Sequence, residues 1–184
     1  MDFLQLVKKR YSVRKFDTRK IEKEKLNQIL EAGRVAPTAL NFQPQRILVL
    51  DKEDSLEKLR ECTPYHFNAP MILIICYDKV TCWKNINNIS SGQIDATIVG
   101  THMMLEAANL EIGSTWVGHF DRELIRNKFN IPEYLEIVSI LTLGYPADGS
   151  EPIPLHYKKF EIEHTVFYNS FDGIVEGKIH DAKY

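Results

Sequence analysis

Residues 70–76 read Pro-Met-Ile-Leu-Ile-Ile-Cys, an unbroken apolar run near the middle of the chain. A strand with one solvated face would alternate apolar and polar residues, so this run predicts a strand that is covered on both faces. Such a strand takes a central position in its sheet. The run is also too short to cross a bilayer, which requires about 20 apolar residues in a helix.

The segments on either side of this run alternate between strand and helix patterns. Further strands are expected at Arg46–Leu50, where the apolar composition predicts burial, and at Ser114–Phe120 and Ile137–Leu143. Helical periodicity predicts helices over Asp2–Lys9, from Thr18 to just before Pro37, and over Ser55–Glu61, Ile94–Leu110 and Asp121–Phe129. Residues Arg10–Phe16 suit an extended segment. This mixture predicts an α/β or α+β fold around a mainly apolar sheet.

The helix expected at Ile94–Leu110 carries apolar residues around most of its circumference. One sheet face covers only part of such a helix, so a second copy of the chain is a plausible source of the remaining cover. Asp95 is an exception on this helix. A buried carboxylate needs a partner such as an arginine or a backbone amide, and we expect a structural pairing here.

Composition and charge exclude several classes of protein. The 184 residues are 44% hydrophobic and 26% charged, which excludes a disordered or collagen-like chain and predicts a single domain. The 23 Lys and Arg against 25 Asp and Glu leave a net charge of -2. There is no global positive field for a nucleic-acid backbone, so neither a nucleic acid nor a membrane is expected as a partner.

The opening residues and the cysteines indicate a reducing compartment. Residues 1–5 lack the basic and then apolar regions of a secretory signal, so we expect a cytoplasmic protein. The three cysteines, Cys62, Cys76 and Cys82, form no C-x-x-C pair and are interpreted as free thiols. The histidines show no ligand spacing, so no metal is expected.

Arg10-Tyr11-Ser12-Val13-Arg14 contains the first candidate site. In an extended segment Arg10, Ser12 and Arg14 fall on the same side, because side chains alternate with a period of two. Two guanidinium groups and a hydroxyl suit a phosphate dianion. Solvated basic residues after a helix are the alternative interpretation.

Three further groups are weaker when each is taken alone. Residues 36–45 place two prolines and several carboxamides in one loop, which suits the edge of a uracil-like ring or, alternatively, an ordinary turn. Residues 116–120, Trp-Val-Gly-His-Phe, include a glycine that admits a planar ligand or marks a bulge. The pair Lys158-Lys159 is either an anion ligand or simply exposed.

In this order, these groups resemble the nitroreductase family of flavin mononucleotide (FMN) enzymes. The matching motifs are R-x-S-x-R-x-F at Arg10–Phe16, A-P-T-A-x-N-x-Q-P at Ala36–Pro44, the helix at Ile94–Leu110, W-V-G-H-F-D at Trp116–Asp121 and L-G-Y-P at Leu143–Pro146. The resemblance implies an α+β fold with a central, mainly antiparallel sheet flanked by helices, and an intertwined homodimer. Residues 1–184 would form one FMN-binding domain in which residues 160–184 are a tail on the partner. Within the tail, Thr165–Asn169 resembles a strand added to the partner's sheet.

The resemblance also implies a role for each candidate residue. Arg10 and Ser12 are similar to cofactor ligands at the phosphate, together with Lys159 or Lys158, and Tyr11 is a further candidate cofactor contact. Arg14 is similar to the basic residue beside N1 and O2 of the flavin, where it would stabilise negative charge. Further cofactor contacts are implied for Pro37, Thr38, Ala39, Asn41 and Gln43, in a loop reaching from the other subunit, and for Val117 and Gly118 beside flavin N5. His119 and Phe120 are candidate substrate contacts.

The activity implied is hydride transfer from NADH or NADPH, through flavin N5, to a nitroaromatic, a quinone or a related small electrophile. No side chain of the chain is expected to act as an acid or base, since the flavin carries the chemistry. The alternative is a flavin-binding protein that stores or senses flavin without turnover.

Overall fold

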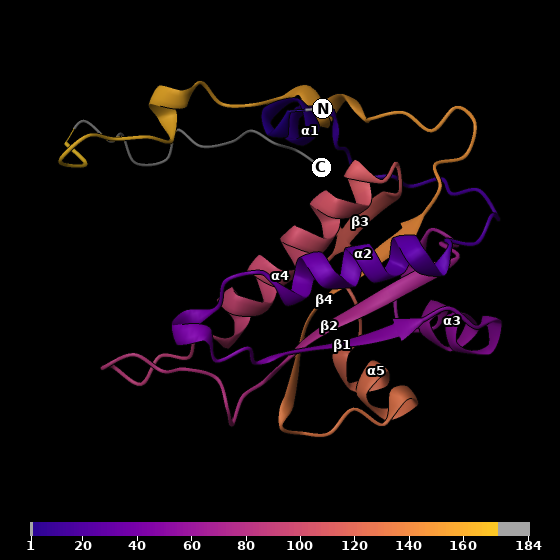
Figure 1. Cartoon of the computed structure of the whole chain (residues 1–184), viewed down its shortest axis with the longest axis horizontal. Helices are drawn as coiled ribbons and strands as arrows, with labels where there is room; N and C mark the ends of the chain where they lie inside the picture. Colours follow the sequence, from indigo (N-terminus) through magenta and orange to yellow (C-terminus); the bar gives the residue numbers. More distant parts are fainter. Residues whose placement is uncertain (1, 173–184) are drawn as a thin grey trace. The chain divides into compact units, whose positions relative to one another are not determined.

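The computed structural model describes residues 2–172, which divide after Pro152 into two compact units. The first unit contains a four-stranded sheet with the order β1-β2-β4-β3 (Figure 1). Its strands are β1 (Gln45–Leu50), β2 (Met71–Asp78), β3 (Gly113–Val117) and β4 (Leu135–Gly144). Each neighbouring pair is antiparallel, and β2 lies in the interior of the sheet. The expected antiparallel α+β architecture is therefore confirmed.

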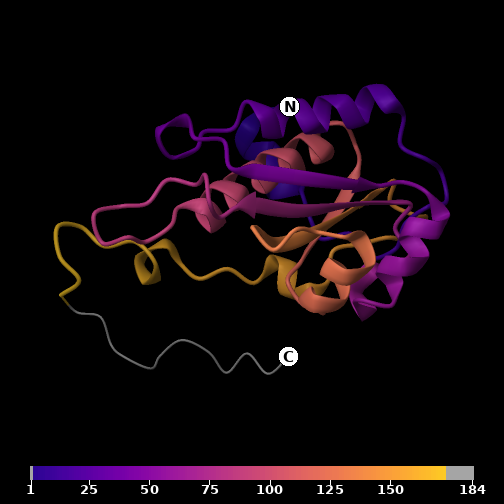
Figure 2. The ribbon, with the colours of Figure 1, turned by 90° about the horizontal axis from the view of Figure 1, so that it is seen from below.

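Five α-helices accompany the sheet in the described part of the chain. They are α1 (Phe3–Lys9), α2 (Lys23–Arg34), α3 (Glu53–Arg60), α4 (Gly92–Asn109) and α5 (Arg122–Phe129). Helices α2 and α4 pack on one face of the sheet, and α3 and α5 pack on the other (Figure 2). This two-sided cover is what the apolar run at 70–76 predicted.

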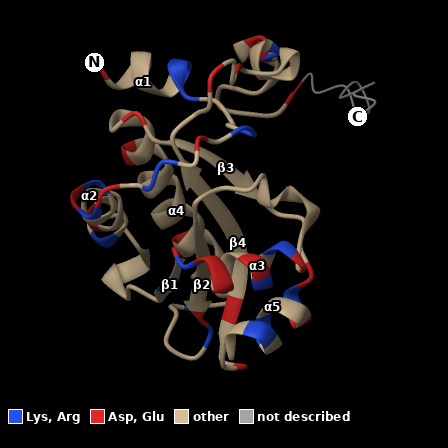
Figure 3. Ribbon diagram, turned by 90° about the vertical axis from the view of Figure 1, so that its right-hand side faces the viewer, with Lys and Arg blue, Asp and Glu red and all other residues tan. Residues whose placement is uncertain are grey.

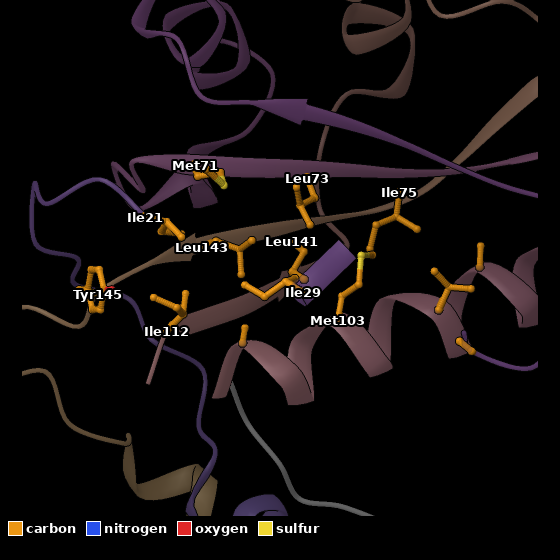
Figure 4. Packing of buried hydrophobic residues seen from close by; sticks show 14 residues of the cluster. Ile21, Ile29, Met71, Leu73, Ile75, Met103, Ile112, Leu141, Leu143 and Tyr145 are labelled. Atoms are coloured by element: carbon orange, nitrogen blue, oxygen red, sulfur yellow. The ribbon is translucent and has the colours of Figure 1, made fainter. Parts of the chain in front are cut away.

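The alternating side chains of β2 supply both halves of the core. Leu73 and Ile75 point into the cluster beneath α2 and α4, while Ile72 and Ile74 join the cluster beneath α3 and α5. Figure 4 shows the first cluster, in which Met103 of α4 lies among side chains from β2 and β4. All four β2 side chains are essentially inaccessible to solvent. Strand β2 therefore packs against both helical layers, one on each face of the sheet.

Two expectations about elements were wrong in part. The helix expected from Thr18 begins at Lys23, because the preceding residues bind instead to the end of β4: the Arg19 guanidinium lies 3.2 Å from the centre of the Tyr145 ring. The Tyr145 hydroxyl donates to Glu22, and this hydrogen bond lowers the pKa of the Glu22 carboxyl. The strand at Arg46–Leu50 exists, but it is an edge strand with alternating burial and not a fully buried one.

The second unit, described from Ile153 to Asp172, contains two short 3₁₀ turns, Pro154–Tyr157 and Ile162–His164. Residues 165–169 form no strand in this single chain. The expected pairing of these residues with a partner's sheet needs a second copy and stays a prediction. The rest of the expected tail, residues 173–184, lies outside the described residues, and the single-domain organisation also stays a prediction.

The charged side chains lie mainly on the outer surface. Figure 3 shows both signs next to each other on α3 and α5, where the Arg60–Glu53 and Lys128–Glu61 ion pairs measure 2.6 and 2.7 Å. Within residues 2–172, no helix is long and apolar enough to span a membrane.

We expect the centre of β2 to be far more sensitive to truncation than the edge of the sheet. Leu73→Ala removes a fully buried side chain and should lower the free energy of unfolding by about 2–5 kcal/mol. Leu48→Ala on β1, where the side chain is 36% exposed, is the matched control and should cost about 1 kcal/mol or less. Urea denaturation of both variants measures the difference, and equal losses would contradict the assigned burial.

Candidate functional site

The segment Arg10–Phe16 runs past the start of the outer strand β3 and then beside the residues that follow β4, so the expected extended conformation is confirmed. Ser12 pairs with Ser114 in a parallel bridge, and the Val13 amide donates to the Ser114 carbonyl at 3.0 Å. The Thr115 hydroxyl, buried in β3, donates to the Val13 carbonyl. Val13 itself is buried. Because these contacts hold its backbone, the segment presents its basic residues at the edge of the sheet.

A cavity of about 200 Å³ opens between α1, the end of α4 and the start of β3. Arg10, Tyr11 and Ser114 are among its lining residues, together with the charged Lys9 and Glu111. The Ser114 hydroxyl is buried and has no hydrogen-bond partner within residues 2–172. The cavity therefore combines cationic side chains with an unsatisfied hydroxyl, a combination that suits an anionic oxygen ligand.

Arg14 lies further along the same segment and is exposed. Its Nη1 donates to the Ser12 carbonyl at 3.1 Å, which leaves the rest of the guanidinium fork available for a ligand. Neither Ser12 nor Arg14 is among the residues lining the cavity. Arg10 and Arg14 thus occupy separate places along one extended segment, and their contacts with one ligand stay a prediction.

The loop from Pro37 to Gln43 is compact and partly strained. Leu40, Asn41 and Gln43 all have positive φ angles, between 47° and 57°. The Thr38 hydroxyl accepts a hydrogen bond from the Gln43 amide at 3.0 Å inside the loop. Positive φ angles at non-glycine residues cost free energy, and they cluster at ligand-binding segments.

Asp95 holds this loop from below. Its Oδ1 accepts the Ala39 amide at 2.9 Å, so the expectation of a backbone-amide partner for this carboxylate is confirmed. Pro37, Asn41 and Gln43 are exposed above this contact, whereas Thr38 and Ala39 are half-buried. The loop is accordingly anchored at its base and open at its tip.

The residues that follow β3 form a second open segment. The strand ends at Val117, three residues before its expected end, so His119 and Phe120 lie in the turn before α5. A side chain at Gly118 would find no neighbour within 4 Å. The space beside Gly118 is therefore open to a ligand. Val117 is buried in the core and contributes only its backbone to this edge.

Thr63 and Tyr65 complete this turn, although sequence reasoning did not select either residue. The buried Thr63 hydroxyl donates to the His119 carbonyl at 2.7 Å and accepts the Tyr65 amide at 3.1 Å. The Tyr65 ring packs edge-on against the His119 ring at 5.5 Å between centroids. Thr63, Tyr65 and Ser114 carry no motif in the sequence, because their partners are distant along the chain.

Lys158 and Lys159 belong to the second unit. Both are exposed, and the Lys159 Nζ donates to the carbonyl of His156 in the same unit. Arg10 and Ser12 lie in the first unit. The meeting of these four residues at one phosphate stays a prediction.

The cysteines are buried in the part of the chain that the structure describes, and none forms a disulfide there. Burial raises the pKa of the Cys62 thiol, and it raises the pKa of Cys76 to about 11. Thiols in such surroundings stay protonated and react slowly. Cys62 and Cys76 are therefore structural side chains.

Comparison with known proteins identifies the family. The sequence pattern of the nitroreductase family matches residues 7–63 and 64–145, and the chain belongs to this family. A relative from Methanothermobacter thermautotrophicus, named "Putative NADH dehydrogenase/NAD(P)H nitroreductase", is 32% identical over 174 residues, which cover 87% of this chain and 88% of the relative.

Two solved structures from Clostridium difficile are also similar. A nitroreductase family protein from strain 630 is 37% identical, with a TM-score of 0.87, over 92% of this chain and 99% of that one. An FMN-dependent nitroreductase from strain R20291 is 26% identical, with a TM-score of 0.76, over 92% of this chain and 100% of that one. The likeness covers nearly the whole of each chain.

Proposed function

We propose that this chain is an FMN-dependent oxidoreductase that transfers hydride from NADH or NADPH to a small electrophile such as a nitroaromatic or a quinone. The observation that carries the proposal is the cavity at the start of β3, which Arg10 and the buried Ser114 line, together with the open space at Gly118 just after the end of this strand, in a nitroreductase-family fold. The names of two similar proteins, an NAD(P)H nitroreductase and an FMN-dependent nitroreductase, support the same activity.

Two local features support the fit of FMN to this edge. The Ser114 hydroxyl, buried without a partner within residues 2–172, is available to a phosphate or ribityl oxygen in the cavity that Arg10 lines. The open space beside Gly118 lets a planar ring approach the backbone. The cavity lies at the start of β3 and Gly118 follows its end, so the two places suit a cofactor with an anionic tail at one end and a flat ring at the other.

The residues divide into three roles along this edge. Arg10 and Ser12 bind the anionic tail, and Lys158 or Lys159 adds a cation to it. Tyr11, whose hydroxyl donates to the Ser150 carbonyl at 2.8 Å, adds a further cofactor contact. Val117 and Gly118 offer their backbone to the ring, and His119 and Phe120 face the electron acceptor. The remaining cofactor contacts come from the 37–43 loop of a second copy of the chain. The contacting residues in this loop are Pro37, Thr38, Ala39, Asn41 and Gln43.

Bound FMN supplies the redox chemistry, since its ring accepts hydride from the nicotinamide and passes it to the acceptor. Arg14 would hold a permanent positive charge beside the pyrimidine part of the ring, as the family resemblance implies. A fixed charge of this kind stabilises negative charge that develops during reduction, and it needs no reorganisation at that moment. No side chain has to donate or remove a proton in this scheme.

A homodimer completes the site in this proposal. A cavity of about 200 Å³ is smaller than the roughly 300–1,000 Å³ typical of pockets for small-molecule ligands. Ile94 on α4 is 63% exposed, and Leu40 at the tip of the 37–43 loop is 75% exposed. Apolar residues exposed at these levels on a helix and an adjacent loop support an interface with a second copy.

Anaerobic stopped-flow spectroscopy tests the activity directly. NADH or NADPH should bleach the flavin absorbance of the FMN-loaded protein, and a nitroaromatic or quinone should restore it. Bound flavin that neither nicotinamide reduces would favour storage or sensing instead of turnover. A purified protein that binds no added FMN would overturn the proposal.

We expect Arg10→Ala to weaken the binding of FMN but not of riboflavin, which lacks the phosphate. Loss of one charge-assisted hydrogen bond, worth about 1.5–3 kcal/mol, corresponds to a roughly ten- to hundredfold rise in the dissociation constant. Fluorescence titration with both flavins measures this difference. An equal loss for the two flavins would contradict a phosphate contact at Arg10.

Replacement of Arg14 should slow flavin reduction even when the cofactor site is full. With FMN at saturating concentration, Arg14→Ala should reduce the rate of bleaching by NADH or NADPH roughly 10²-fold, the effect of losing one preorganised electrostatic contact. Lys15→Ala removes the neighbouring exposed cation and is the control. Reduction of the Arg14 variant at the wild-type rate would rule out this role.

A further inference from the structure

Asp95 is a buried carboxylate at the start of α4 whose two oxygens bind different segments. Oδ1 accepts the Ala39 amide at 2.9 Å, and Oδ2 accepts the Ser91 hydroxyl at 2.7 Å. Asp95 is only 2% exposed to solvent. An ionised carboxylate acts only as an acceptor, so both of its neighbours here are donors and both are satisfied.

The first segment, residues 37–43, needs an external support. Its positive φ angles at Leu40, Asn41 and Gln43 are unfavourable conformations that persist only where the surroundings enforce them. Leu40 and Phe42 are 75% and 50% exposed, so the tip has little packing of its own in this chain. The hydrogen bond from Ala39 to Asp95 ties the base of the loop to a helix of the core.

The second segment lies between β2 and α4, over residues 79–91. Ser91 ends it. Its amide donates to the Trp83 carbonyl at 2.9 Å, and its hydroxyl, whose one proton goes to Asp95 at 2.7 Å, lies 3.2 Å from the same carbonyl. Lys84 and Ser90 form an antiparallel bridge within this segment, so residues 79–91 form a loop whose two ends are held together. Asp95 contacts the end of this loop through Ser91. The Asp95 carboxylate thus connects the 37–43 loop to the 79–91 loop.

We infer that Asp95 is a positioning residue that sets the conformation of the 37–43 loop and thereby its contact with the cofactor. This inference rests on the proposed function, in which that loop reaches the FMN of the second copy. Asp95 touches neither cofactor nor substrate. It acts through the Ala39 amide, and Ser91 orients the carboxylate for that contact.

Two substitutions at Asp95 separate the role of its hydrogen bonds from the role of its charge. Asp95→Ala leaves the Ala39 amide and the Ser91 hydroxyl without their acceptor in a buried place. Asp95→Asn keeps an oxygen for Ala39, and the Ser91 hydroxyl can rotate to accept from the new amide group. The asparagine variant should therefore keep most of the loop conformation. Glu57→Ala, which removes an exposed carboxylate from α3, is the control for loss of an acid.

Amide hydrogen exchange of the flavin-free full chain tests the positioning itself. Asp95→Ala should raise exchange at residues 39–43 at least about tenfold relative to core amides of α4, and Asp95→Asn and Glu57→Ala should stay near wild type. Unchanged exchange in a folded Asp95→Ala variant would overturn the inference. This result does not depend on flavin binding, so it is distinct from failure of the proposed function, which wild-type protein that binds no FMN would reveal.

FMN titration and steady-state kinetics test the consequence. Asp95→Ala should raise the dissociation constant for FMN roughly ten- to hundredfold, while kcat at saturating FMN should change less than threefold because no reacting atom is touched. Asp95→Asn should bind FMN with an affinity close to that of the wild type. A loosened loop with unchanged FMN affinity would refute the link between Asp95 and the cofactor.

Ala39→Pro provides an independent variant in case Asp95→Ala does not fold. Proline removes the amide that Asp95 accepts, and the extended backbone of Thr38, with φ -133° and ψ 160°, is compatible with a following proline. If Asp95 acts through this amide, Ala39→Pro alone should raise the dissociation constant for FMN roughly ten- to hundredfold, as expected for Asp95→Ala. A folded Ala39→Pro variant with wild-type FMN affinity would overturn the proposed route.

Discussion

Burial of β2 and β4 between two helical layers is the constraint on which the other features depend. Leu73 and Ile140 are fully inaccessible to solvent, and they point to opposite faces of the sheet. Burying such a side chain contributes about 1.5–3 kcal/mol, so the two inner strands dominate the stability of the first unit. The outer strands β1 and β3 then lie at the edges of the sheet, and Ser12 of the candidate segment Arg10–Phe16 pairs with the edge of β3.

Single buried polar groups attach the irregular segments to this core. The Thr115 hydroxyl holds Val13, the Asp95 carboxylate holds Ala39, and the Thr63 hydroxyl holds the turn at His119. Each group is buried, so its hydrogen bond is shielded from competing water, and its loss would leave a polar atom unsatisfied. This arrangement gives loops a defined position without packing them. It also leaves their tips open for a ligand or a second chain.

The electrostatics of the proposed site are local. The net charge of -2 provides no general attraction for an anion, so the cations of one short segment have to bind it. Arg10 lines a cavity that also contains the unsatisfied Ser114 hydroxyl, and Arg14 stands apart from that cavity. One arginine therefore serves binding and the other serves reduction in our proposal, because the separation along an extended segment gives them different neighbours.

The sequence by itself determined the central strand, the antiparallel α+β class and the candidate residues of the site. Uninterrupted apolarity at 70–76 is a local signal of burial on two faces, and the ordered motifs identify the family. The predicted start of α2 and the predicted full burial of β1 were wrong. Contacts with Tyr145 decide where the helix starts, and the order of the sheet places β1 at its edge. Only the tertiary structure brought Ser114 to Arg10, Thr63 to His119 and Asp95 to Ala39. These partners are far apart along the chain, and no local periodicity encodes a hydrogen bond that forms only after the sheet and its helices have packed.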